Sequence, residues 1–431
     1  MAMVMSTVIP MAVKQNRDRA LASPMNRLSH NKRSFTEWSI RVAIALIVLA
    51  VGLFGMLQSF ANITRRSDPL RAYMMLANDG RITASAAEQY MQQKPSGRIE
   101  STPARFARLA LQQDPTAVTA VVVLASQAQI RNDSSEARRL FNYAEHLSRR
   151  NLPAQLWAIE DAVSRGQVSK ALRHYDIALR VSRNASKILY PVLASALSEP
   201  AIRSGLTVTL ASKPIWGSSF IAYALGSTTD PRNIASLFND MRESRVDVAP
   251  EASSSLIDRL LLISAPEDAW RYYTSLGSNI ARNKSRDPYF ANAISTSQFD
   301  WKITDRNDLS VSIQKDSRNG VVDYSVPTGN SGTILQQLQM LPPGKYRLTG
   351  SGSGLDQPDL SMPYWTLTCL AGGELGRINL IRSKQEVSTF SGRFTVPGNC
   401  PVQTLSFVAR PTDSFTGIQG RINRVELTPD R

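Results

Sequence analysis

The sequence is poor in the residues that bind metals and carry out redox chemistry. It has three histidines and two cysteines among 431 residues, and no Cys-x-x-Cys pair. Zinc and iron–sulfur sites need several such ligands at short spacing, so we expect no metal and no cofactor. A hydrophobic content of 42% excludes a disordered chain, and the chain is long enough for two or three domains.

Motifs of common enzyme classes are also missing. No Gly-x-Ser-x-Gly elbow is present, and the glycine-rich stretch 350–354 is followed by neither a helix pattern nor a phosphate-binding lysine. We expect His146 and His174 to be solvated or packed rather than catalytic. Acidic residues of the C-terminal third could supply the carboxylate pair of a glycoside hydrolase, but the spacing singles out no pair. We therefore do not expect an enzyme, and a divergent glycan-active enzyme stays as an alternative.

Long apolar runs are absent except for one. Residues 42–64 contain no charged side chain, and a helix with a rise of about 1.5 Å per residue crosses about 30 Å of hydrocarbon over this length. The preceding tail, 1–38, carries six Lys or Arg and two Asp or Glu. This bias predicts a cytoplasmic tail, a transmembrane helix at 39–63 and a bulk on the far side. The alternative is a signal peptide cleaved near residue 61.

Positive charge exceeds negative charge, with 50 Lys and Arg against 35 Asp and Glu. Outside the tail, most of this excess lies in residues 65–294. A basic surface can attract anionic lipid headgroups or an anionic polymer, or simply keep the protein soluble. We do not expect nucleic acid as a partner, because the bulk lies outside the cytoplasm. In a Gram-negative bacterium, the helix would span the inner membrane and the bulk would be periplasmic.

Residues 64–294 have the apolar spacing of helices, with breakers between the segments. Two segments repeat after 34 residues, and in each an alanine, an aromatic residue and an alanine align: Ala137, Phe141 and Ala144, then Ala171, Tyr175 and Ala178. This pattern resembles the second helix of tetratricopeptide repeats, where small residues let helices approach closely. The resemblance implies stacked helix pairs over 118–151 and 152–185, divergent pairs further on, and a surface that docks envelope proteins.

Beyond residue 295 the pattern changes to β-structure. Apolar residues alternate over seven short segments with turn residues between them; the segments are 322–326, 346–348, 365–369, 378–380, 394–396, 405–409 and 425–427. Many short strands at this spacing predict an antiparallel β-sandwich, or jelly roll, for 295–431. The predicted fold class is therefore multidomain α + β, with one transmembrane helix, a helical solenoid and a C-terminal sandwich.

Two stretches of this last region, 341–348 and 420–427, resemble the jelly-roll carbohydrate-binding modules, with Asn423 where these often have Asp. Sugar recognition needs aromatic rings that stack on apolar pyranose faces. The candidates are Tyr364, Phe415 and Trp301. Trp365 shares a strand face with Leu367, and we expect it in the core.

Both cysteines lie in β segments beyond the predicted membrane helix. In an oxidising compartment, Cys369 and Cys400 are expected to form a disulfide, the alternative being two buried free thiols.

As a whole, the order of tail, membrane helix, helical repeats and sandwich resembles the repeat-containing membrane proteins of bacterial exopolysaccharide synthesis and export. The first hypothesis is a non-enzymatic envelope protein that organises or binds polysaccharide, an anionic one included. The second is a general periplasmic scaffold or chaperone whose sandwich is purely structural.

Overall fold

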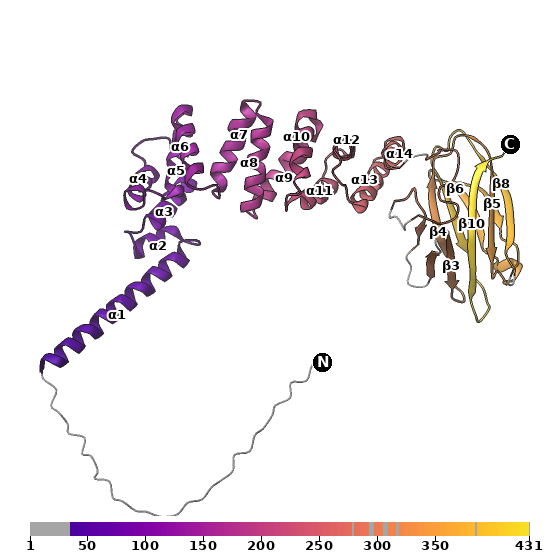
Figure 1. The fold of residues 1–431 in the computed structure, drawn as a ribbon, viewed down its shortest axis with the longest axis horizontal. Coiled ribbons are helices and arrows are strands. Elements are labelled where there is room, and N and C mark those ends of the chain that lie inside the picture. Colours follow the sequence, from indigo (N-terminus) through magenta and orange to yellow (C-terminus); the bar gives the residue numbers. More distant parts are fainter. Residues whose placement is uncertain are drawn as a thin grey trace, which may run out of the picture.

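The computed structural model describes residues 35–277, 280–292, 297–304, 309–315, 319–383 and 386–430. Residues 1–34, which form most of the predicted basic tail, lie outside these ranges. In the described ranges, one long helix is followed by a row of shorter helices and then by a β-sandwich (Figure 1). This confirms the predicted fold class of a helical region followed by an antiparallel two-sheet sandwich.

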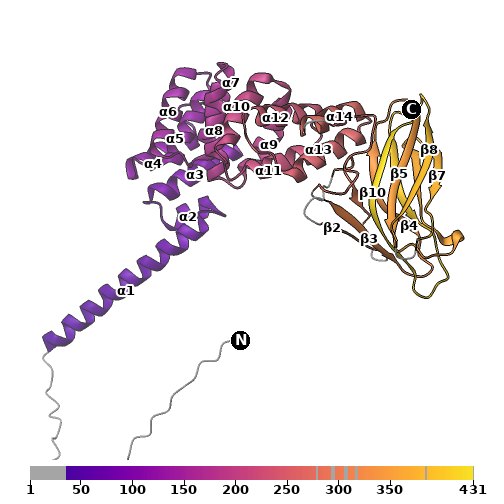
Figure 2. The same ribbon diagram turned by 45° about the vertical axis from the view of Figure 1, so that its right-hand side comes forward.

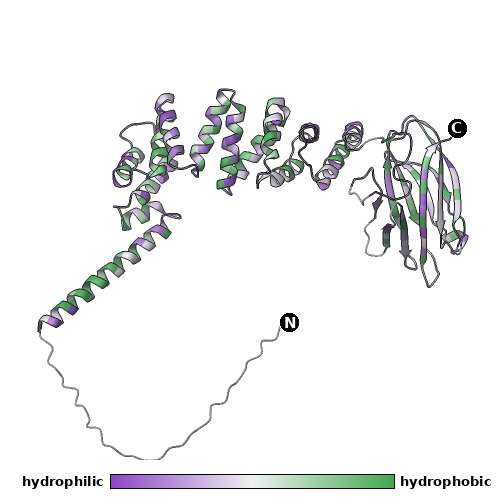
Figure 3. Ribbon diagram, in the orientation of Figure 1, coloured by the Kyte–Doolittle hydropathy of each residue, from purple (hydrophilic) through white to green (hydrophobic). Residues whose placement is uncertain are grey.

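Helix α1 (Phe35–Thr64) projects away from the rest of the chain (Figure 1). It is the one described helix that is long and apolar enough to cross a membrane, with a mean hydropathy of 2.6 and none of its apolar stretch buried. Apolar residues cover it over most of its length (Figure 3). Its last turn differs, because Ala61 is buried together with Ala72 and Ile82. The end of α1 is therefore fixed to the first helices of the row.

The row consists of thirteen α-helices within the described ranges, mostly of 10 to 14 residues. They are α2 (Pro69–Met75), α3 (Gly80–Gln93), α4 (Thr102–Gln113), α5 (Val118–Ile130), α6 (Ser134–Leu147), α7 (Leu152–Ser164), α8 (Val168–Val181), α9 (Ala185–Ser195), α10 (Pro200–Ala211), α11 (Gly217–Gly226), α12 (Pro231–Glu243), α13 (Pro250–Leu262) and α14 (Pro266–Ser275).

Helices α5 and α6 pack as one pair, and α7 and α8 pack as the next. The two aligned alanine–aromatic–alanine sets lie on α6 and α8, and all six side chains are buried. Phe141 of α6 also stacks on Trp157 of α7, with ring centroids 4.5 Å apart, so the first pair is joined to the second.

Gly80 marks a close approach between the start of α3 and the end of α4. A Cβ atom at this position would lie 2.5 Å from Asp114 Cβ and 2.8 Å from Asp114 N. Because a backbone atom cannot swing aside, we expect Gly80→Ala to lower the free energy of unfolding by about 1–3 kcal/mol, measured as a lower Tm. Gly226→Ala is the control, since nothing lies within 4 Å of its Cβ position. Equal losses in the two variants would contradict this argument.

Within the described residues, the sandwich contains ten strands in two five-stranded antiparallel sheets, ordered β1-β4-β9-β6-β7 and β2-β3-β10-β5-β8. The strands are β1 (Lys302–Ile303), β2 (Ser310–Lys315), β3 (Gly320–Val326), β4 (Gly332–Gln339), β5 (Gly344–Ser353), β6 (Tyr364–Cys369), β7 (Glu374–Asn379), β8 (Ser388–Val396), β9 (Gln403–Ala409) and β10 (Ile418–Pro429).

Strand pairing identifies the topology as a jelly roll. β3 pairs with β10, β4 with β9, β5 with β8 and β6 with β7. The first four of these strands therefore pair with the last four in reverse order, as in a long hairpin folded over on itself. The core between the sheets includes Trp365, Phe407 and Tyr324, all essentially inaccessible to solvent. The predicted disulfide is confirmed: Cys369 at the end of β6 is bonded to Cys400, just before β9.

The helical row and the sandwich share a hydrophobic core. Phe299, Met340 and Val402 from the sandwich side pack in one cluster with Trp270 and Leu256 of the last helices, which lie beside the sandwich in Figure 2. Helix α14 ends at Ser275, and the segment that follows it contacts the sandwich. The boundary between the two regions was predicted at 294/295, which is after this segment.

Two residues of that segment join the strands to the last helix. Ser285 N donates to Leu427 O at 2.9 Å, and Leu427 N donates to Ser285 Oγ at 2.8 Å. Arg286 is buried, and its guanidinium lies against Trp270, 5.3 Å from the ring centroid. The two regions are therefore held together by packed side chains and hydrogen bonds.

Candidate functional site

One register row of polar residues crosses all five strands of the β1-β4-β9-β6-β7 sheet. Cross-strand pairing links, in order, Lys302, Gln336, Ser406, Thr366 and Arg377. Directly paired residues of antiparallel strands point to the same face. This face is the outer one, because Phe407, Trp365 and Ile378, which neighbour the row residues along β9, β6 and β7, belong to the core between the sheets. Short hydroxyl side chains occupy the middle of the row, and long polar side chains stand at its ends.

Tyr364 lies in the next row of this outer face, between Val408 and Asn379. The guanidinium of Arg377 is 4.2 Å from the centroid of the Tyr364 ring, and that of Arg410 is 4.8 Å away. Arg410 also donates to Asn379 Oδ1 at 2.8 Å. These contacts fix two cations on one tyrosine ring at the surface. We call Tyr364, Arg377, Asn379 and Arg410 the Tyr364 face.

The two arginines differ in how far their charge is neutralised. Arg377 donates to both carboxylate oxygens of Glu374, at 3.0 and 2.9 Å, and this contact holds the pKa of Glu374 below its usual value. Arg410 forms no salt bridge with any residue in the described ranges. Among the described residues the face therefore carries a guanidinium with no carboxylate partner, a group whose planar fork fits a carboxylate, sulfate or phosphate in bidentate fashion.

The structure places the three predicted aromatic platforms differently. Tyr364 is half-buried on the outer face. Phe415 is fully exposed in the loop after β9, which leaves the sheet at the end where β6 begins. Trp301 is 4% exposed, packs against Trp365 at 5.8 Å between ring centroids, and donates from Nε1 to Asp287 O. Core side chains cover its ring faces, so Trp301 cannot stack on a sugar and is no longer a candidate binding residue.

Sequence reasoning did not find Arg377 and Arg410. Residue alternation alone places Arg377 on the face opposite Ile378, but it gives no strand register. Only the pairing of Tyr364 with Asn379 and Val408 brings the two arginines onto one ring.

His146 of α6 and His174 of α8 lie apart from this face. His146 Nδ1 is 2.7 Å from Asn142 O of its own helix. His174 is buried, with Nδ1 2.8 Å from Gln155 Oε1, and burial lowers the pKa of its imidazole. In the described ranges, no group of three or more His, Cys, Asp or Glu side chains is arranged to hold a metal ion.

No family model matches this chain, and no curated protein sequence matches it. Among solved structures, TmCBM61 in complex with β-1,4-galactotriose is similar at 16% identity and a TM-score of 0.26, covering 35% of this chain and 100% of that one. The family 11 carbohydrate-binding module of Lic26A-Cel5E from Clostridium thermocellum is similar at 11% identity and a TM-score of 0.24, covering 35% and 97%.

The enzymatically active domain of tailspike protein 4 from bacteriophage CBA120 is similar at 13% identity and a TM-score of 0.25. That match covers 35% of this chain and 21% of the tailspike chain, so this protein spans about a fifth of it. At such scores these likenesses carry no argument about activity, and the jelly-roll assignment rests on the strand pairing described above.

Proposed function

We propose that this protein is a non-enzymatic, membrane-anchored protein that binds acidic polysaccharide through the Tyr364 face. The observation that carries the proposal is the pair of guanidiniums held on one tyrosine ring at the surface, at 4.2 and 4.8 Å. Arg410 has no carboxylate partner in the described ranges, so it is available to an acidic group of a ligand. The ends of the polar row beside it add the amide of Gln336 and the ammonium of Lys302, whereas Ser406 and Thr366 in its middle are buried.

The arrangement of the chain supports an anchored role. Helix α1 stands at one end and the sandwich at the other, with the helical row between them (Figure 1). In this proposal α1 is a single transmembrane helix of the inner membrane, the tail is cytoplasmic and the remainder is periplasmic. The helical row, stacked as tetratricopeptide-like pairs and exposing Ile215 and Leu262, docks envelope proteins. Exopolysaccharide assembly or export is the process that fits an anchored polysaccharide binder.

Binding of the full chain in detergent micelles to an immobilised acidic polysaccharide tests the proposal. Polygalacturonate is the acidic probe and dextran the neutral one, read by biolayer interferometry. We expect binding to polygalacturonate alone, and we expect Arg410→Gln to weaken it about tenfold, because a charge-assisted pair is lost. Tyr364→Leu should weaken it as well, since the ring orients both guanidiniums.

Arg421→Gln is the matched control, because it removes the same charge from β10 in the other sheet, where Arg421 pairs with Asp323 at 3.3 Å. Equal weakening by R410Q and R421Q would mean diffuse electrostatic attraction and would refute a specific face. Release of soluble products from the glycan would overturn the non-enzymatic assignment.

A further inference from the structure

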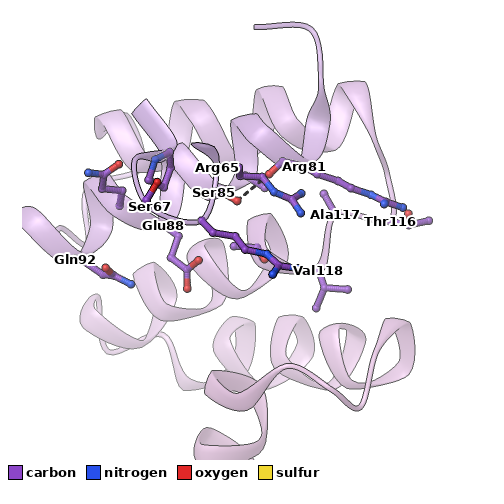
Figure 4. A pocket seen from close by; sticks show the side chains of 14 residues that line it. Arg65, Ser67, Arg81, Ser85, Glu88, Gln92, Thr116, Ala117 and Val118 are labelled. Atoms are coloured by element: carbon purple, nitrogen blue, oxygen red, sulfur yellow. Dashed lines mark hydrogen bonds between the residues drawn. The ribbon is translucent and has the colours of Figure 1, made fainter. Parts of the chain in front are cut away.

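A pocket of about 690 Å³ lies at the end of α1, where the membrane helix meets the helical row. Side chains from the segment after α1, from α3 and from the start of α5 surround it (Figure 4). Its charged lining consists of Arg65, Arg66, Arg81 and Glu88. The polar part of the remaining lining comes from hydroxyl and amide side chains: Ser67, Ser85, Gln89, Gln92, Thr116 and Thr119.

The charges of this pocket are poorly compensated. Arg65 and Arg66 form no salt bridge with any residue that the structure describes, whereas Arg81 Nε lies 3.6 Å from Asp114 Oδ2. Helix α5 has no side-chain cap at its N-terminus, and the positive end of its dipole lies at the same pocket. Guanidiniums, hydroxyls and amides together suit an anion with several acceptor oxygens and neighbouring hydroxyl groups.

Glu88 is the one acidic residue in the lining. It forms no salt bridge within the described ranges, and partial burial raises the pKa of its carboxyl. Its negative charge opposes an anion in the pocket, so removing that charge should strengthen anion binding. This gives the pocket a variant whose effect is opposite in sign to that of the arginine variants.

The pocket also lies at a defined place along α1. Arg65 directly follows Thr64, the last residue of the helix, and the exposed apolar surface of α1 ends there. The packing of Ala61 with Ala72 and Ile82 fixes this end against the row. With α1 across a membrane, Arg65 and Arg66 lie in the headgroup layer, which extends about 5–8 Å beyond the hydrocarbon.

We propose that this pocket binds the phosphate-ester headgroup of an anionic membrane lipid. Arg65 and Arg66 pair with the phosphate oxygens, and the hydroxyl and amide side chains contact the polar remainder of the headgroup. The acyl chains then extend along the exposed apolar surface of α1. This inference rests on the proposed role of α1 as a membrane span, but not on the sugar-binding role of the Tyr364 face.

Native mass spectrometry of the full chain, purified in detergent and supplied with equal amounts of phosphatidylglycerol and phosphatidylcholine, tests the pocket. We expect the wild type to retain phosphatidylglycerol in preference. The double variant Arg65→Gln with Arg66→Gln should lose about tenfold of that preference, and Glu88→Gln should increase it. A wild type that retains both lipids equally would overturn the proposal.

The double variant Arg71→Gln with Arg105→Gln is the matched control, since it removes two positive charges from exposed side chains of the neighbouring helices α2 and α4 that do not line the pocket. If this control loses as much lipid preference as R65Q/R66Q, the preference comes from diffuse electrostatic attraction and the proposed site is refuted. A second arm supplies sn-glycerol 3-phosphate. If this soluble ester binds more tightly than the lipid, the phosphate ester comes from solution and the lipid assignment is wrong.

Two further measurements on the same variants separate this inference from the proposed function. Carbonate extraction of vesicles tests the anchor, and polygalacturonate binding tests the Tyr364 face. R65Q/R66Q should remain in vesicles and bind polygalacturonate like the wild type. If carbonate extracts the wild-type protein from vesicles, α1 is not a membrane anchor and the lipid site is refuted with it. If R65Q/R66Q stays in the vesicles but loses its lipid preference, the result concerns the pocket alone.

Discussion

Replacing Arg286 with methionine is expected to lower the free energy of unfolding by about 2–6 kcal/mol, because two buried carbonyl oxygens lose their hydrogen-bond donor. The guanidinium donates to Phe299 O at 2.6 Å and to Leu338 O, and it lies among the rings of Trp270, Tyr273 and Phe299. Burial lowers its pKa to about 10. Methionine fills a similar volume but leaves both carbonyls unpaired, each at a cost of about 1–3 kcal/mol.

Thermal unfolding of the full chain in detergent, followed by calorimetry, measures this loss. Arg271→Gln is the control, because Arg271 is an exposed residue of α14 that pairs with Asp268 at the surface, where such pairs contribute about 0–1 kcal/mol. Since Arg286 joins the helical row to the sandwich, R286M should also separate the unfolding of the two regions. An R286M protein as stable as R271Q would show that the junction does not depend on this side chain.

Removing the disulfide is expected to lower the free energy of unfolding of the sandwich by about 3–4 kcal/mol, from the entropy of a cross-linked loop of this length. The bond joins Cys369 to Cys400 across 31 positions, and it ties the end of β6 to the segment that enters β9. Denaturant titration of Cys369→Ala with Cys400→Ala measures the loss. A reductant should reproduce it in the wild type and change nothing in the double variant. A wild type whose midpoint is insensitive to reductant would contradict this expectation.

Seven of the strands were predicted from alternating apolar residues, whereas β1, β2 and β4 were not. β4 was not predicted because side chains on both of its faces are buried. Ile334 and Leu335 belong to the sandwich core, whereas Leu338 packs in the cluster of the helical row. Gln337 is fully buried and exchanges two hydrogen bonds with the backbone of Arg286. A strand buried on both faces loses the alternation that reveals strands.

The candidate site was predictable in part for a related reason. The alternation of apolar and polar residues predicts Trp365 in the core and Tyr364 on the opposite face of the strand, because both lie on the regular strand β6. Trp301 precedes the two-residue strand β1, where no alternation exists to place it. The arginines of the Tyr364 face come from β7 and from the end of β9, and their meeting depends on a long-range register that local patterns do not contain.

The two packed junctions of the chain have a mechanical consequence. Ala61 is buried with Ala72 and Ile82 where α1 meets the row, and Phe299 is buried with Trp270 where the row meets the sandwich. Neither junction is a slack tether of the kind that glycine- and serine-rich linkers provide. If the sandwich holds a polymer, as we propose, tension on that polymer would be transmitted through these packed side chains to α1. Force applied to the sandwich should therefore change the tilt of α1.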